Sequence, residues 1–207
     1  LILWGFFKKL VFADQLGLIA DDVFGNHEDL AGIESIVGIL AFTGQIYGDF
    51  SGYSDIARGL AKLMGFELMV NFRLPYFAAN PAEFWRRWHI SLSSWIRDYL
   101  YIPLGGSRSD RVSTYRNLML AMVLAGLWHG AAWNFVLWGA FHGAALVVHR
   151  LYLDFRSLRP DRPTAPHPLR RLGQMAVMFL VATIGWVMFR SENVAQMISM
   201  VSSIEPS

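Results

Sequence analysis

The chain has 207 residues, of which 54% are hydrophobic and only 16% are charged, and it contains no cysteine. Soluble globular domains carry about 25% charged residues, so this composition indicates a membrane protein. The absence of cysteine excludes disulfides, thiol catalysis and cysteine metal sites. The net charge of +2 comes from basic residues that flank apolar stretches. No nucleic-acid-binding motif accompanies them, so we do not expect binding to nucleic acid.

The first third of the chain is predicted to be helical. Residues 1–20 are apolar but include three charged side chains, which favours an interfacial or partly buried helix. Residues 32–65 are compatible with a second helix, and residues 32–48 within it are a candidate for membrane burial. The chain starts within an apolar pattern and shows no signal-peptide pattern. We therefore expect it to be a C-terminal portion of a longer protein.

A polar stripe follows one face of the second predicted helix. On a helix, residues three and four apart share a face, which groups Tyr47, Ser51, Ser54, Asp55 and Arg58. Polar groups at membrane depth generally face the protein interior or a cavity. Two interpretations stay open: a hydrogen-bond network between helices, or the lining of a substrate path. Under the second, Tyr47, Ser51 and Asp55 are candidate substrate-binding residues.

An amphipathic helix is predicted over residues 80–102. Asn80 is suited to cap its start, and Glu83 falls in its first turn. Charged residues alternate with tryptophans along this segment, which is typical of a helix at a membrane surface. Arg86 and Arg87 have two interpretations that stay open: they hold an anionic ligand, or they anchor the helix at lipid headgroups.

Residues 117–149 contain no Asp, Glu, Lys or Arg. As one helix this segment would be about 50 Å long, whereas the hydrocarbon core of a membrane is about 30 Å thick. Gly126 and Gly130 flank Trp128 and His129, so we predict a break there. Irregular backbone at membrane depth is tolerated where it is buried in protein or lines a wet cavity, so we expect His129 to line a cavity.

The last third of the chain is predicted to contain a further spanning helix. Residues 172–189 are apolar and lie between two arginines. Residues 154–171 form a basic, proline-rich segment that we expect to be a loop. The positive-inside rule places this loop on the cytoplasmic side.

Among the six histidines, His129 is the strongest candidate for chemistry. A neutral imidazole in a low-dielectric cavity is suited to accept a proton from a hydroxyl, but a purely structural buried histidine is equally compatible with the local sequence. His142 is expected mainly to have a structural role. No spacing of histidines or carboxylates fits a haem or zinc site, so we expect no metal.

Three stretches together resemble the membrane-bound O-acyltransferase family, and in particular its bacterial alginate O-acetyltransferase branch. They are "QIYGDFSGYSDIARGLAKLMGF", "NPAEFWRRWHISLSSWIRDYLYIPLGGSR" and "GLWHGAAWNFVLWGAFHG". The resemblance covers residues 1–190. It implies an all-α, polytopic membrane helical bundle with broken or re-entrant and interfacial helices, as a single domain over residues 1–207. Gly48 departs from the family, which usually carries Phe there; this changes either local packing or a tunnel wall.

The resemblance also implies roles for individual residues. The histidine of "WHG" is the catalytic one in the family, which corresponds to His129, and the second key position corresponds to His89. Trp128 and Asn134, in the same motif, are added as candidate substrate-binding residues. The implied reaction is transfer of an acetyl group from a cytoplasmic donor, acetyl-CoA, with no bound cofactor.

The resemblance further implies the setting of the reaction. The acetyl group would pass to an extracytoplasmic acetyltransferase partner and then to a polysaccharide, either an alginate-like exopolysaccharide or a cell-wall glycan. The protein is expected to cross the bacterial inner membrane several times. The alternatives that stay open are D-alanyl transfer to teichoic acid, and a non-catalytic membrane transporter or scaffold.

Overall fold

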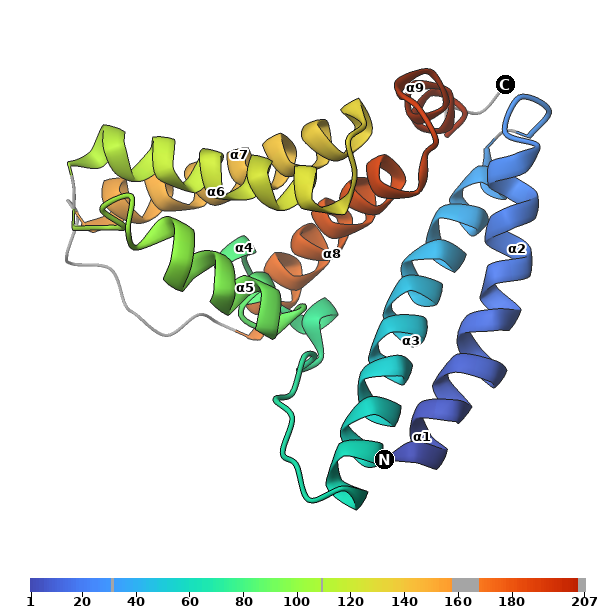
Figure 1. Ribbon diagram of the computed structural model, residues 1–207. Coiled ribbons are helices and arrows are strands. Elements are labelled where there is room, and N and C mark those ends of the chain that lie inside the picture. The colour runs from blue at the N-terminus through green and yellow to red at the C-terminus, as the bar shows by residue number, and fades with distance from the viewer. Residues whose placement is uncertain (31, 109, 158–167, 205–207) are drawn as a thin grey trace. The chain divides into compact units, whose positions relative to one another are not determined.

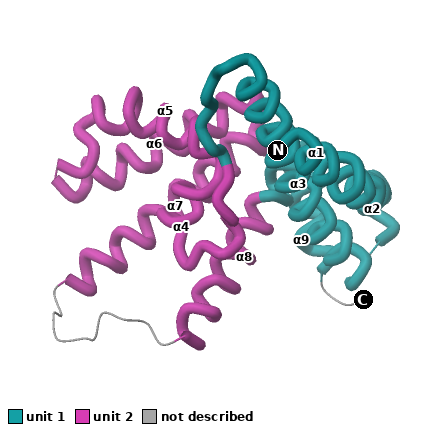
Figure 2. Tube along the Cα trace, turned by 90° about the horizontal axis from the view of Figure 1, so that it is seen from below, with its two compact units in different colours: residues 1–71, 186–207 teal, residues 72–185 magenta. Residues whose placement is uncertain are grey.

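The computed structural model describes residues 1–30, 32–108, 110–157 and 168–204. Every regular element in these ranges is helical (Figure 1), which confirms the all-α prediction for the described residues. The chain divides into two compact units, Leu1–Asn71 with Trp186–Ser207 and Phe72–Gly185 (Figure 2). The single membrane domain expected over residues 1–207 stays a prediction. The expected basic loop, residues 154–171, lies largely outside the described residues.

The first unit is built on two long helical stretches that run antiparallel (Figure 1). One stretch is continuous through α1 (Ile2–Phe6), the π-helix η1 (Phe7–Ala13) and α2 (Asp14–Gly25). The other is α3 (Ile33–Leu63). These are the two helices that the sequence predicts in this region.

Glycines on α3 allow the two stretches to approach closely. A Cβ atom on Gly52 would lie only 2.8 Å from the carbonyl oxygen of Gly5, and one on Gly48 would lie 2.7 Å from Cδ1 of Phe12. Side chains at these positions would push the helices apart, and small residues are typical of tightly packed membrane helices. Gly48 therefore makes a packing contact with Phe12.

Helix α9 (Val194–Ser202) packs at one end of the first unit. The side-chain amide of Gln196 donates a hydrogen bond to the Phe24 carbonyl at 2.8 Å. The backbone N–H of Gly32 donates to the Ser203 carbonyl at 2.6 Å. These bonds tie α9 to the loop that joins α2 and α3.

The second unit contains the remaining elements. They are η2 (Pro75–Phe77), α4 (Pro81–Trp85), α5 (Ile90–Ile96), the π-helix η3 (Arg97–Tyr101), α6 (Arg111–His129), α7 (Trp133–Ser157) and α8 (Pro168–Arg190), whose last residues belong to the first unit. Helices α6 and α7 pack antiparallel (Figure 1). A Cβ atom on Gly126 or Gly139 would overlap the backbone of the other helix. The two glycines therefore permit direct backbone contact between the helices.

The long neutral segment is broken where the sequence predicts. Helix α6 ends at His129, the backbone of Gly130 is extended, and α7 begins at Trp133. Within the described ranges, α7 and α8 are the two helices long and apolar enough to cross a membrane. The predicted span over residues 172–189 lies within α8. The third candidate, residues 32–48, lies in α3, which does not meet the same criterion.

The prediction of one continuous helix over residues 80–102 is wrong. Asn80 caps the start as expected, because its side chain accepts a hydrogen bond from the Glu83 N–H at 2.8 Å. However, α4 ends at Trp85, and His89 adopts a left-handed conformation with φ 43° and ψ 56° before α5 begins. The carbonyl of Arg87 accepts a hydrogen bond from the Arg73 N–H at 3.0 Å. The Arg87 carbonyl therefore bonds to a neighbouring segment at the point where the helix is interrupted.

Candidate active site

His129 lies at the C-terminal end of α6, where the chain turns towards α7. Its imidazole is half-buried and lies among aromatic rings. The ring centroids of His129 and Trp128 are 4.9 Å apart, and those of His129 and Trp138 are 5.3 Å apart, both edge to face. The break after α6 therefore places this imidazole at a helix end with tryptophans on two sides.

His89 also lies near Trp128. Its ring centroid is 6.3 Å from that of Trp128. Non-glycine residues adopt left-handed backbone conformations infrequently, and such conformations cluster at functional sites. Burial, with a smaller contribution from the charge of His129, lowers the pKa of His89 from 6.5 to about 4. The His89 imidazole is consequently neutral at physiological pH.

A shallow pocket opens beside these rings. It has a volume of about 340 Å³ and is lined by His89, Ser91, Leu92, Trp95 and Trp128. His129 is not among its lining residues, although it directly follows Trp128 in the chain. The pocket offers an open, largely apolar surface next to one candidate histidine.

His142 occupies the core of the second unit. It is fully buried, and neither ring nitrogen has a hydrogen-bond partner among the described residues. Its ring lies 5.1 Å from that of Trp85 and 5.0 Å from that of Trp138. Trp138 therefore contacts both His129 and His142. A Cβ atom on Gly185 would overlap the His142 ring, so glycine is needed there.

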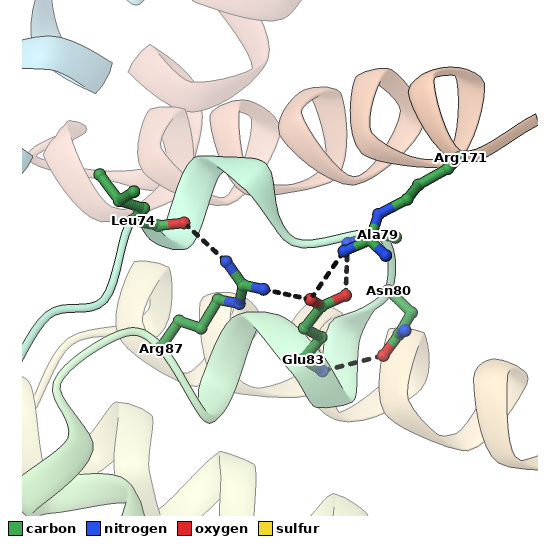
Figure 3. A network of polar contacts seen from close by, with 6 residues as sticks. All are labelled: Leu74, Ala79, Asn80, Glu83, Arg87 and Arg171. Atoms are coloured by element: carbon green, nitrogen blue, oxygen red, sulfur yellow. Dashed lines mark hydrogen bonds and ion pairs between the residues drawn. The ribbon is translucent and has the colours of Figure 1, made fainter. Parts of the chain in front are cut away.

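The predicted residues Arg86 and Arg87 have different surroundings. Arg86 is exposed. Arg87 forms an ion pair with Glu83 and donates a second hydrogen bond to the Leu74 carbonyl at 3.4 Å. Figure 3 shows Arg87 and Arg171 converging on the Glu83 carboxylate. Arg87 thus joins the start of α4 to the segment before η2.

Glu83 is the centre of this network. Burial acts to raise the pKa of its carboxyl group, but a hydrogen bond from the Ala79 N–H and the charges of Arg87 and Arg171 together hold the pKa below its usual value. A carboxylate that stays ionised keeps Arg87 paired. A donor-binding role for Arg86 and Arg87 stays a prediction.

The predicted polar stripe lies in the first unit and contacts the η1 helix. The ammonium group of Lys8 donates to Asp55 Oδ2 at 2.7 Å and to Ser51 Oγ at 3.0 Å. Arg58 contacts the other carboxylate oxygen of Asp55 at 3.3 Å. These contacts support the interpretation as a network between helices. Tyr47 lies on the same helix, and substrate binding by Tyr47, Ser51 and Asp55 stays a prediction.

The remaining predicted residues lie at the break between α6 and α7. Trp128 is exposed at the end of α6, and Asn134 is buried in the first turn of α7. The second unit thus brings together His89, Trp128 and His129. Sequence reasoning missed Trp138, which contacts His129, although its spacing of four residues from Asn134 places both on one helix face. It also missed Lys8 as the partner of Asp55. No group of three potential metal ligands occurs among the described residues.

Comparison with known proteins relates most of the chain to one family. The family model of the membrane-bound O-acyltransferases matches residues 29–189. The chain is 51% identical over 189 residues to a probable alginate O-acetylase AlgI of Azotobacter vinelandii, covering 91% of this chain and 36% of that protein. It is 43% identical over 189 residues to a peptidoglycan O-acetyltransferase of Helicobacter pylori, covering 91% of this chain and 35% of that protein.

A more distant relative transfers a different group by name. The chain is 31% identical over 176 residues to a teichoic acid D-alanyltransferase of Streptococcus thermophilus, covering 79% of this chain and 42% of that protein. The chain spans about a third of the length of the first two relatives. The matched region contains both candidate histidines and the break between α6 and α7. The chain therefore belongs to the membrane-bound O-acyltransferase family.

Proposed function

We propose that the protein containing this chain is an O-acyltransferase that moves an acetyl group from a cytoplasmic donor towards an extracytoplasmic polysaccharide. The observation that carries the proposal is the placement of the His89 and His129 rings beside the same residue, Trp128, with each histidine next to a break between helices. The identity of 51% to a probable alginate O-acetylase and of 43% to a peptidoglycan O-acetyltransferase supports acetyl transfer to a polysaccharide.

In the proposed reaction, His129 acts as the general base. The imidazole accepts the proton of an acceptor hydroxyl while the hydroxyl oxygen attacks the acetyl carbonyl. The carbon–oxygen bond forms, the carbon–sulfur bond of the thioester breaks, and the leaving thiolate takes the proton back from the imidazolium. His89, which is neutral, orients the acceptor or donates a hydrogen bond to the developing oxyanion.

Acetyl-CoA is the proposed donor. The thioester supplies the leaving group that this reaction requires. An extracytoplasmic acetyltransferase partner would carry the acetyl group to the polymer. We place the protein in the bacterial inner membrane as a multi-pass protein, supported by α7 and α8 as candidate spans.

The proposal is tested in the full-length protein that contains this chain. His129→Gln keeps a polar side chain of similar size but removes the base, so polymer-bound acetate should fall by about 10²–10⁴-fold. His89→Ala should also reduce transfer. The control is His27→Gln in the first unit, where the histidine contacts Ser199. Wild-type acetylation by membrane-inserted, folded His129→Gln would remove His129 from the mechanism.

D-alanyl transfer to teichoic acid is the second candidate, favoured by the 31% identity to a teichoic acid D-alanyltransferase. Its donor would be a carrier protein rather than a coenzyme. Offering labelled acetyl-CoA and carrier-bound D-alanine in parallel to the purified protein and its partner separates the two. Transfer of acetyl alone supports the first proposal, and transfer of D-alanine alone supports the second. Transfer of neither would favour a transporter or scaffold.

A further inference from the structure

A second pocket lies at the end of α6 that is remote from His129. Its volume is about 640 Å³, within the roughly 300–1,000 Å³ range of small-molecule sites. It is lined by Arg97, Tyr101, Ile102, Gly105, Gly106, Ser107 and Arg108. Helix α6 has 19 residues and is therefore about 28 Å long. This Arg97–Arg108 pocket shares no lining residue with the pocket beside His89.

Four of the residues that line the pocket have side chains that can donate hydrogen bonds: Arg97, Tyr101, Ser107 and Arg108. Arg97 and Arg108 bring two positive charges, and no carboxylate is among the lining residues. Arg97 contacts Asp98 through Nε at 2.7 Å and Nη2 at 3.0 Å, which leaves its Nη1 for a ligand. The Arg108 guanidinium is exposed and has no side-chain partner in the described part of the chain. The planar guanidinium fork matches phosphate oxygens.

Two backbone acceptors beside the pocket are already engaged within the protein. The carbonyl of Tyr101 accepts a hydrogen bond from the Gly106 N–H at 2.9 Å. The carbonyl of Leu104 accepts one from the side chain of Asn117 at 2.8 Å, and Asn117 is fully buried. Gly106 has a positive φ of 54°, which favours glycine and allows the tight turn. The turn is therefore fixed on α6, and these carbonyl groups are engaged elsewhere, which favours an anion.

The local structure and charge of this end of the unit agree with a binding site. Arg97 and Tyr101 both belong to the π-helix η3, and π-helical turns occur frequently at functional sites. The Tyr115 hydroxyl donates to Asp154 at 2.8 Å, so the start of α6 and the end of α7 lie together. Arg116 adds positive charge to the same end, whereas Arg150 is paired with Asp154 at 3.3 Å.

We propose that the Arg97–Arg108 pocket binds the phosphate group of a phosphate ester. Two guanidinium groups, a serine hydroxyl and a tyrosine hydroxyl supply donors around a preformed turn. The phosphate belongs either to a phospholipid headgroup at the membrane surface or to a soluble phosphate-bearing molecule. Both have the same chemistry at this pocket, so the experiment has one arm for each.

The test uses the full-length protein and the variant R97Q/R108Q, which removes both charges at exposed positions. The matched control is R111Q, because Arg111 is exposed at the start of α6 but does not line the pocket. In the first arm, binding of inorganic pyrophosphate in a phosphate-free detergent is measured by calorimetry. In the second, the protein is placed in nanodiscs of phosphatidylcholine with phosphatidylglycerol, and the lipids that stay bound on extraction are measured by mass spectrometry.

Saturable pyrophosphate binding that weakens at least about tenfold in R97Q/R108Q, but not in R111Q, assigns the pocket to a soluble phosphate compound; tenfold corresponds to about 1.4 kcal/mol. Enrichment of phosphatidylglycerol that is lost in R97Q/R108Q but kept in R111Q assigns the pocket to a lipid headgroup. The proposal is overturned if neither ligand binds, or if R111Q weakens binding as much as R97Q/R108Q. An unchanged melting temperature of the double variant shows that the variant is folded.

Discussion

The polar stripe of the first unit and the histidines of the second unit are held in opposite ways. In the first unit, Asp55 is paired with Lys8 at 2.7 Å and with Arg58 at 3.3 Å, between helices that touch through glycines. In the second unit, His129 and His142 lie among tryptophan rings, and both nitrogens of His142 lack hydrogen-bond partners in the described residues. Neutralised charges join helices in the first unit, whereas the second surrounds neutral proton acceptors with aromatic rings. We therefore expect substitutions of these polar residues in the first unit to lower stability, and substitutions of the candidate histidines in the second unit to lower the rate of transfer.

The largest change in stability is expected for Asp55→Ala, which leaves Lys8 and Arg58 without their shared partner. Removing one member of a buried ion pair costs about 3–5 kcal/mol, and both side chains of the Lys8–Asp55 pair are mostly buried. The control is Asp49→Ala, because the Lys9–Asp49 pair is about 40% exposed and exposed pairs contribute about 0–1 kcal/mol. Thermal unfolding in detergent measures both. Equal, small shifts for the two variants would contradict a structural role for the Asp55 network.

A smaller loss is expected for Gly139→Ala at the contact between α6 and α7. Its Cβ would overlap the backbone at Met122 and Val123. Overpacking of this kind costs about 1–3 kcal/mol. Gly173→Ala is the control, because a Cβ on Gly173 meets nothing within 4 Å. If Gly173→Ala lowers the melting temperature as much as Gly139→Ala, close helix packing does not explain the effect.

Sequence reasoning succeeded where local rules decide the structure. The break after His129 followed from segment length and from Gly130, and the cap at Asn80 followed from its residue type. The break at His89 was missed because it accompanies a tertiary hydrogen bond between Arg73 and Arg87. Such a bond joins segments whose proximity no local pattern predicts.

For the candidate functional residues, the sequence predicted the two histidines but not the pairing of Lys8 with Asp55. His129 came from its position at the predicted break together with the family resemblance, and His89 came from the resemblance alone; the structure places both beside Trp128. The pairing of Lys8 with Asp55 was missed because the two residues are 47 positions apart and meet only through packing of η1 on α3. Helical periodicity reports which residues share a face but not what that face contacts.

A change close to neutral is expected for His142→Leu. The buried imidazole has no hydrogen bond to lose, and replacing an unsatisfied polar group by an apolar group of similar size is close to neutral or stabilising. The free energy of unfolding should change by no more than about 1 kcal/mol, and thermal unfolding measures this change. A loss of acetylation beyond tenfold in folded His142→Leu would instead show that His142 positions His129 through Trp138.

The smallest expected effect is the pH dependence of transfer that arises from His89. Because burial lowers the pKa of His89 to about 4, the imidazole stays neutral as pH falls through 6 and becomes protonated only near pH 4. The part of the pH–rate profile that depends on His89 should therefore fall near pH 4. It can be identified by comparing the native protein with His89→Asn. A fall near pH 6.5 that disappears in His89→Asn would contradict the buried, neutral state.

The most direct test compares the two units in one assay. Full-length His129→Gln and Lys8→Met are expressed in the same strain, and polymer-bound acetate is measured per folded molecule in the membrane. We predict that His129→Gln loses transfer by about 10²–10⁴-fold at an unchanged melting temperature. Lys8→Met should lower the melting temperature but keep transfer per folded molecule. Retained transfer in His129→Gln, or lost transfer in fully stable Lys8→Met, would contradict the assignment of chemistry to the second unit.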